Sequence, residues 1–378
     1  MKKNDKLKIF VILGTRPEII KLSRVIPKLQ AFFETTVIHT GQNYDFELNE
    51  IFYKDLEIKK PNIYLNAAGK SYAETIANVI HETDKLIVKH NPDACLILGD
   101  TNSSLAAIPA KRRKVPIFHM EAGNRSYDFR VPEEVNRRIV DHISDINLTY
   151  SKIAKTYLER EGIPSEQIIF TGSPMKEVLD FYSEKIKNSN ILEKLKIKSH
   201  KYFLVSCHRE ENVDNEIKLN ALINILSFIS KKYKLPIIVS THPRTRKKLK
   251  KIKLISNKNI KFLKPFSFSD YIYLQKNSKS VLSDSGTITE ESSILNFPAL
   301  NLRESHERPE GFEEGSVMMV GLNLDRIENG LEILNSQKRD NIRSLNIIDD
   351  YNVDNVSEKI TRIILSYIDY INKFVWKK

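Results

Sequence analysis

Short apolar segments rich in β-branched residues alternate along the chain with longer amphipathic stretches. In the first half the apolar segments cover residues 8–14, 35–40, 94–100, 116–121, 146–150 and 167–172. After a helix-like stretch at about 174–195 the pattern restarts, with apolar segments at 202–207, 236–242, 260–265, 280–286 and 298–303. Continuous apolar strands that alternate with helices are typical of parallel sheets covered by helices on both faces. The pattern therefore predicts an α/β protein.

The restart of the pattern predicts two such domains, at 1–172 and 173–352. A length of 378 residues agrees with two domains. The last stretch, 353–378, spaces isoleucines such as Ile360, Ile364 and Ile368 at helical intervals and predicts a terminal helix. The sequence leaves open whether this helix crosses back to the first domain.

Charge and composition exclude several classes of protein. The formal charge is +12, but many lysines lie in runs such as 246–253 without interleaved aromatic residues. Nucleic-acid surfaces normally combine basic and stacking side chains, so we expect no nucleic-acid partner. The apolar runs fall short of the roughly 18 residues of a membrane span, and the run at 9–13 is interpreted as a first strand, not a signal peptide. Cys95 and Cys207 lie in apolar segments, which predicts buried, reduced thiols in a cytoplasmic protein.

Polar and ionisable residues follow the expected strands, where open parallel sheets bind their ligands. They occupy residues 14–18, 99–101 and 119–123 in the first half, and 208–210, 242–244 and 283–287 in the second. Arg16 would lie at a helix N-terminus, with Lys21 one turn later, which favours an anion grip for a phosphate or diphosphate. The alternative is a surface arginine at a helix cap. The turn lacks a G-x-G-x-x-G pattern, so a nicotinamide cofactor is not expected.

Three carboxylates form a second candidate cluster. Asp100 and Glu121 end expected strands, and Glu133 lies where Pro132 starts a helix. If the strands are neighbours, like charges would raise one pKa and separate a proton acceptor from a proton donor. His119 and Glu121 also imitate the H-x-E of zinc deaminases, but the P-C-x-x-C partner is missing, so no metal is expected.

The second half carries a candidate nucleotide pocket. Ser285 and Gly286 lie in an expected turn between strand and helix, where backbone N–H groups can cradle a pyrophosphate. Glu291, one turn into the helix, could accept hydrogen bonds from a ribose diol. Additional candidate pocket residues are His208, His242 and Phe266, with Phe266 packing on a base.

Ordered motifs across nearly the whole chain resemble the non-hydrolysing UDP-N-acetylglucosamine 2-epimerases. They are GTRPE (14–18), GDT (99–101), HMEAG (119–123), PEEVNR (132–137), HREEN (208–212), DSG (284–286) and ERPE (307–310). The resemblance implies two Rossmann-like domains of the GT-B type, with the active site in the interdomain cleft. It implies that the first domain carries the sugar and the catalytic carboxylates and that the second binds UDP. It also implies a homodimer without metal or nicotinamide.

The resemblance further implies C2 epimerisation of a UDP-N-acetylhexosamine through elimination of UDP to a glycal and re-addition, for surface polysaccharide precursors. Arg16, Lys21 and His208 match positions that stabilise the departing diphosphate. Asp100, Glu121 and Glu133 match the acid/base carboxylates, and the UDP-binding positions also include His242, Phe266, Ser285, Gly286 and Glu291.

Two departures from the family pattern bear on the substrate. The chain has GTITEE at 286–291 where GGIQEE is usual, and His306 where threonine is usual. Both resemble the branch that acts on UDP-2-acetamido-2,6-dideoxy-L-hexoses, which forms UDP-N-acetyl-L-fucosamine, and we favour that substrate over UDP-N-acetylglucosamine, whose product would be UDP-N-acetylmannosamine. The alternatives of another class are a GT-B glycosyltransferase and a non-catalytic UDP-sugar-binding protein.

Overall fold

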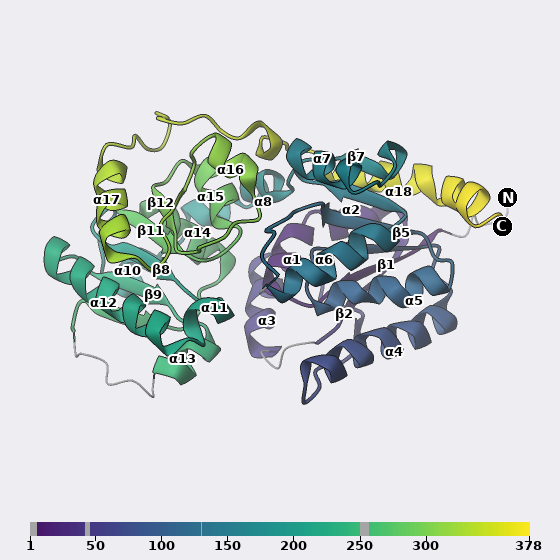
Figure 1. Cartoon of the computed structure of the whole chain (residues 1–378), viewed down its shortest axis with the longest axis horizontal. Coiled ribbons are helices and arrows are strands. Elements are labelled where there is room, and N and C mark those ends of the chain that lie inside the picture. The colour runs from purple at the N-terminus through teal and green to yellow at the C-terminus, as the bar shows by residue number, and fades with distance from the viewer. Residues whose placement is uncertain (1–5, 42–45, 130, 250–256) are drawn as a thin grey trace. The chain divides into compact units, whose positions relative to one another are not determined.

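The computed structural model describes residues 6–41, 46–129, 131–249 and 257–378. The chain divides into two compact units, Met1–Phe181 with Asp349–Lys378 (unit 1) and Tyr182–Ile348 (unit 2), whose elements are labelled in Figure 1. The division falls after 181 instead of 172 because helix α8 (Met175–Phe181) packs within unit 1. There the Arg24 guanidinium carbon lies 3.4 Å from the centroid of the Phe181 ring.

The described part of unit 1 contains a parallel sheet with the strand order β3-β2-β1-β4-β5-β6-β7. Its strands are β1 (Lys8–Leu13), β2 (Glu34–His39), β3 (Ile63–Tyr64), β4 (Ala94–Leu98), β5 (Ile117–Ala122), β6 (Ile146–Thr149) and β7 (Ile168–Phe170). The order reverses between β1 and β4. The turns that follow these two strands therefore flank the position where such sheets bind ligands.

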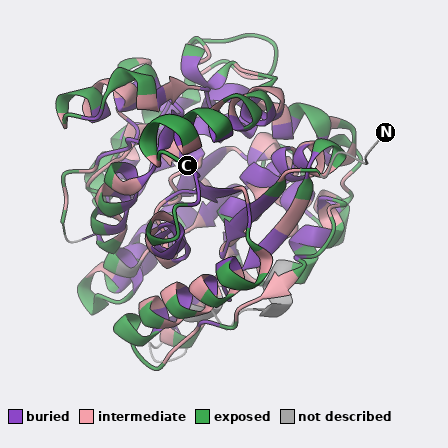
Figure 2. Cartoon of the chain, turned by 90° about the vertical axis from the view of Figure 1, so that its right-hand side faces the viewer, coloured by how far each residue is buried: buried purple, intermediate pink, exposed green. Residues whose placement is uncertain are grey.

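Helices surround this sheet; the strands consist mainly of buried residues, and exposed residues lie on the outer surfaces of the helices (Figure 2). They are α1 (Arg16–Leu22), α2 (Val25–Phe32), α3 (Phe46–Asp55), α4 (Tyr72–His90), α5 (Ala107–Arg112), α6 (Pro132–Ile143), α7 (Lys152–Arg160), α8 and α18 (Val356–Tyr370). Helix α18 packs on α2, where Lys28 and Glu358 form an ion pair of 2.5 Å. The terminal segment thus belongs to unit 1.

Unit 2 repeats the architecture, with the described strand order β10-β9-β8-β11-β12-β13. Its strands are β8 (Phe203–Ser206), β9 (Ile237–Ser240), β10 (Ile260–Leu263), β11 (Ser280–Ser283), β12 (Ala299–Asn301) and β13 (Met318–Met319). Its helices are α9 (Ser183–Lys187), α10 (Ile191–Leu195), α11 (Glu210–Val213), α12 (Glu216–Tyr233), α13 (Pro243–Leu249), α14 (Phe268–Asn277), α15 (Ile288–Leu295), α16 (Pro309–Glu313) and α17 (Leu324–Asn335). The strand order here reverses between β8 and β11.

Strand β8 shows why the apolar segments are continuous. Phe203 and Val205 belong to one buried cluster, whereas Leu204 belongs to another. Successive side chains of a strand point to opposite faces, so both faces of this sheet are covered. None of the described helices has the length and apolar character that a membrane crossing requires.

Candidate active site

A buried carboxylate joins the two turns at the switch point of unit 1. Glu18 Oε2 accepts hydrogen bonds from the backbone N–H groups of Gly14 (2.5 Å) and Thr15 (3.2 Å), while Oε1 accepts one from Thr101 Oγ1 (2.8 Å). Burial raises the pKa of Glu18 to about 7, against the opposing effect of these hydrogen bonds. Sequence reasoning gave Glu18 no role of its own, although the spacing from Thr15 is that of a capping box.

Arg16 and Lys21 lie on α1, as the sequence predicts, but with different surroundings. Arg16 is the first residue of the helix, ahead of Pro17, and is half-buried. Lys21 is buried, and its Nζ lies 2.7 Å from Glu121 Oε2. The Glu121 side chain is 15% exposed. One predicted cation is therefore already paired with a predicted carboxylate.

Glu121 has an unusual backbone conformation. Its φ is +65°, and the register between β5 and β6 shifts between Met120 and Ala122. A left-handed residue other than glycine costs of the order of 1–3 kcal/mol and persists where the surroundings enforce it. The bulge re-aims the Glu121 side chain at the end of its strand, which is typical of a functional position.

Asp100 is held by a side chain from α6. Arg137 Nε donates to Asp100 Oδ2 at 2.9 Å, and Asn136 Nδ2 donates to the Asp100 backbone oxygen at 3.0 Å. Asp100 and Glu121 follow or end neighbouring strands, β4 and β5, and each lies beside its own cation. The mutual repulsion that the sequence suggested stays a prediction.

Glu133, the third predicted carboxylate, lies in the first turn of α6 and is half-buried. Its neighbour Glu134 is fully buried and accepts from Arg137 Nη1 at 2.8 Å. Sequence reasoning missed Glu134 and Arg137 as partners of the site. Their positions in the PEEVNR motif were the available signal.

His119 is a buried structural residue. Its Nε2 lies 2.8 Å from the Gly99 carbonyl oxygen and its Nδ1 lies 2.9 Å from Asp141 Oδ1. Both ring nitrogens are thus used inside unit 1, while Glu121 turns to Lys21. Across the described ranges, no group of three His, Cys, Asp or Glu side chains is arranged to hold a metal ion.

The switch point of unit 2 also centres on a buried carboxylate. Asp284 follows β11 and accepts from the backbone N–H groups of His208 (3.0 Å) and Arg209 (2.9 Å), from Asn212 Nδ2 (3.2 Å) and from Cys207 Sγ (3.2 Å). His208 Nδ1 lies 3.1 Å from its Oδ1. Burial by itself would raise the pKa of Asp284, but the His208 charge and these hydrogen bonds hold it well below the ordinary value.

The other predicted residues of unit 2 lie around this centre to different degrees. His242 is half-buried, with its ring centroid 6.2 Å from that of His208. Ser285 and Gly286 form the half-buried turn directly after Asp284. Glu291 is buried and accepts from Gln275 Nε2 at 2.6 Å. Phe266 is partly buried and packs on an apolar cluster of the unit.

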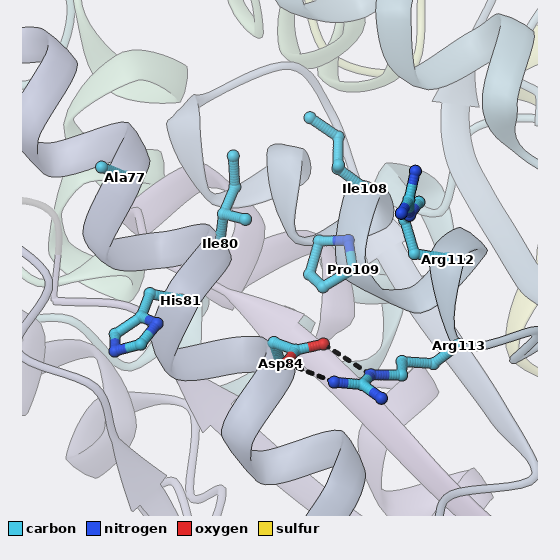
Figure 3. A pocket seen from close by; sticks show the side chains of 8 residues that line it. All are labelled: Ala77, Ile80, His81, Asp84, Ile108, Pro109, Arg112 and Arg113. Carbon is cyan, nitrogen blue, oxygen red and sulfur yellow. Dashed lines mark hydrogen bonds and ion pairs between the residues drawn. The ribbon is translucent and has the colours of Figure 1, made fainter.

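A pocket of about 700 Å³ lies elsewhere, between α4 and α5 of unit 1 (Figure 3). Asp84 lines the pocket and accepts two hydrogen bonds of 2.8 Å from Arg113, which also lines it. The lining consists of Ala77, Ile80, His81, Asp84, Ile108, Pro109, Arg112 and Arg113, a set that is distinct from the residues the sequence singled out.

Comparison with known proteins identifies the family. The sequence profile described as UDP-N-acetylglucosamine 2-epimerase matches residues 28–365. A UDP-N-acetylglucosamine 2-epimerase of Methanocaldococcus jannaschii is 38% identical over 342 residues, which cover 88% of this chain and 93% of the relative.

Two solved structures are similar over almost the entire chain. The UDP-N-acetylglucosamine 2-epimerase from Rickettsia bellii is 48% identical, with a TM-score of 0.93 and coverage of 99% of this chain and 100% of that one. The M. jannaschii enzyme in complex with UDP-GlcNAc and UDP is 35% identical, with a TM-score of 0.88 and coverage of 96% and 100%. The two Rossmann-like units are those of a GT-B-type fold. The chain belongs to the UDP-N-acetylglucosamine 2-epimerase family and is an isomerase.

Proposed function

We propose that the protein inverts C2 of a UDP-N-acetylhexosamine by eliminating UDP to a glycal and adding it back. The observation that carries this proposal is the pair of cation-bound carboxylates at neighbouring strand ends. Lys21 holds Glu121, and Arg137 holds Asp100, at the ligand-binding edge of unit 1. The solved relative with UDP-GlcNAc and UDP bound supports a UDP-sugar as the ligand.

The chemistry explains why carboxylates and cations are both needed. The C2 proton has no neighbouring carbonyl group to acidify it, so direct deprotonation is expensive. Breaking the anomeric bond first places positive charge on the sugar ring, and a carboxylate can then accept the proton. Asp100, Glu121 and Glu133 are the carboxylates assigned to proton transfer and to stabilising that charge.

The departing UDP needs positive charge and hydrogen-bond donors. Arg16 and Lys21 supply cations from unit 1. His208, held by buried Asp284 through its Nδ1, leaves its Nε2 available as the donor toward a diphosphate oxygen. This assignment requires residues of both units to contact the substrate.

The remaining assigned residues would hold the nucleotide. The turn at Ser285 and Gly286 offers backbone N–H groups to the diphosphate. Glu291 would accept from the ribose and Phe266 would pack on the base, with His242 beside His208. Glu291 also accepts a hydrogen bond from Gln275 at 2.6 Å.

We favour UDP-2-acetamido-2,6-dideoxy-L-hexose over UDP-N-acetylglucosamine as the substrate. The departures from the family pattern lie on segments of unit 2 that contact each other. A Cβ on Gly311 would come 2.0 Å from Thr289 Cγ2, and the His306 ring lies 4.2 Å from that of Phe312 in the same short helix, α16. We favour this substrate because both departures resemble the branch that acts on it, and they lie on neighbouring segments of unit 2.

The test is incubation of the purified protein with each UDP-sugar in D₂O, followed by proton NMR. We expect the C2 epimer with deuterium at C2 and without any acceptor. Asp100→Asn, Glu121→Gln and Glu133→Gln should still bind UDP but turn over at least about a hundredfold more slowly, whereas exposed Glu34→Gln should behave as the unmodified chain.

Each alternative predicts a different result. A glycosyltransferase would incorporate no deuterium in the absence of an acceptor, and a binding protein would bind both UDP-sugars without turnover. A lack of C2 epimer from both substrates would refute the proposal. The relative rates with the two UDP-sugars decide the sugar.

We further propose that the protein works as a homodimer in the cytoplasm and supplies precursors of surface polysaccharide. Light scattering of the purified protein tests the first part. A monomer of 43.8 kDa with full activity would contradict it.

A further inference from the structure

A nearly closed ring of ionisable side chains lies beside Asp100 in unit 1. We call it the charge ring. Its members, in order of contact, are Asp100, Arg137, Glu134, Arg138, Glu161, Arg125, Asp141 and His119.

The first arc runs along α6. Arg137 donates to Asp100 through Nε and to Glu134 Oε2 through Nη1, at 2.9 and 2.8 Å. The other oxygen of Glu134 accepts from Arg138 Nε at 3.2 Å. Glu134 is therefore held between two arginines of its own helix, one of which holds Asp100.

The second arc passes through Glu161, the residue that caps the end of α7. Glu161 accepts from Arg138 Nη1 at 3.2 Å and takes two hydrogen bonds from Arg125, through Nε at 2.8 Å and Nη2 at 2.6 Å. The remaining Nη1 of Arg125 donates to Asp141 Oδ2 at 2.7 Å. Asp141 lies on α6, so this arc joins α7 back to the helix on which the first arc began.

His119 closes the ring. Its Nδ1 faces Asp141 Oδ1 and its Nε2 faces the backbone oxygen of Gly99, the residue before Asp100. The ring thus ends one peptide from where it starts.

Burying these charged groups costs free energy, and pairing them does not by itself stabilise the fold. The side chains of His119, Arg125, Glu134 and Asp141 are completely buried. A buried, paired charge generally contributes no more stability than an apolar side chain of the same size. What such a paired network does provide is one fixed geometry, because the members between Asp100 and His119 are each held from two sides.

We propose that the charge ring positions Asp100 for proton transfer, and that Glu161, which has no contact with Asp100 in the ring, is a positioning residue acting through Arg125 and Arg138. This rests on the proposed function, which assigns acid/base chemistry to Asp100. Opening the ring at Glu161 removes a carboxylate that holds both Arg125 and Arg138, which keep Asp141 and Glu134 as their other partners. The Arg137–Asp100 pair then loses the support that fixes its orientation.

The experiment opens the ring at two separate points. Glu161→Gln removes a charge that is 20% exposed and keeps the shape of the side chain. Arg138→Gln breaks the other arc at a position that is 30% exposed. The matched control is Glu159→Gln, on the same helix, whose exposed carboxylate faces Lys155 at 3.9 Å and lies outside the ring.

We expect each ring variant to lose about tenfold in kcat for C2 epimerisation, with KM changed less than about threefold, since misplacement of a catalytic group lowers kcat. Glu159→Gln should be unchanged. Glu161→Asp should recover part of the loss because it keeps the charge. The double variant should be no slower than the slower single variant, because either break opens the same ring.

Several results would overturn the proposal. Ring variants within twofold of Glu159→Gln in kcat would do so, as would losses that multiply in the double variant. If Glu161→Gln does not fold, as measured by circular dichroism, the more exposed Arg138→Gln decides alone. If the unmodified chain gives no C2 epimer, the proposed function fails and the role of the ring fails with it. If the unmodified chain is active and the ring variants are equally active, only the proposed role of the ring is refuted.

Discussion

Glu18 should make the stability of unit 1 fall as the pH rises toward neutrality. Its carboxyl group is buried, and its pKa is raised from 4.5 to about 7. Between these values the folded chain keeps a proton that the unfolded chain releases. The stabilisation is therefore complete below about pH 4.5 and is lost as the pH rises through about 7.

The size of the effect follows from the pKa difference. At about 1.4 kcal/mol per pKa unit, the gap corresponds to roughly 3 kcal/mol, most of it between about pH 5 and pH 8. Glu18→Gln imitates the protonated form. Its amide oxygen can accept from the Gly14 and Thr15 N–H groups, and its amide nitrogen can donate to Thr101 Oγ1. The variant should match the unmodified chain at pH 5 and exceed it by about 2–3 kcal/mol at pH 8.

The assay is equilibrium unfolding in urea at several pH values, followed by the fluorescence of Trp376. This is the single tryptophan of the sequence and lies in unit 1, with Lys111 Nζ 4.9 Å from its ring centroid. Exposed Glu34→Gln is the control and should follow the unmodified chain at every pH. A stability difference between Glu18→Gln and the unmodified chain that stays constant from pH 5 to pH 8 would refute the reasoning.

Three further predictions test the packing around the site. Burial raises the pKa of Cys95 to about 12 and also raises that of Cys207, so neither thiol should react with iodoacetamide at pH 8 until the chain is denatured, as mass spectrometry would show. Gly123→Ala should lower the free energy of unfolding in urea by about 3 kcal/mol or more, because φ is +81° and the new Cβ would lie 2.5 Å from a backbone oxygen of α7. Gly162→Ala is the control: its φ is +87° but its Cβ would lie in open space, so it should cost only about 1 kcal/mol. Lys21→Met should lower the stability of unit 1 by about 2–4 kcal/mol in the same assay, since it leaves a largely buried carboxylate without its cation; a loss below about 1 kcal/mol would contradict this.

The longer strands were predictable because a continuous apolar segment marks each of them. Every expected segment overlaps a strand of the structure, although β2 begins one residue before its segment and β5 ends one residue after its segment. The sequence missed β3 and β13, which have two residues each. Such short edge strands carry no periodic pattern, so only the neighbouring strand defines them.

The candidate site was predictable only in part. Asp100 and Glu121 could be predicted because each follows or ends an expected strand, and parallel sheets bind their ligands at the ends of the strands. The partners of these residues depend on distances that the chain order does not contain. Lys21, for example, was expected to face a diphosphate, whereas in the structure it pairs with Glu121. A helix residue and a strand end that lie 100 positions apart are brought together only by the packing of α1 on the sheet.

Each unit has a buried carboxylate at the switch point of its sheet, but the pKa of the two carboxylates shifts in opposite directions. In each sheet a buried carboxylate bridges the turns after the two strands between which the strand order reverses, Glu18 in unit 1 and Asp284 in unit 2. The donors to Glu18 are neutral and do not offset the cost of burial, so its pKa rises. Asp284 adds the charge of His208 to a larger set of donors, and its pKa falls. Because a buried carboxylate needs either a proton or a cation, the turn that carries Arg16 should loosen near neutral pH.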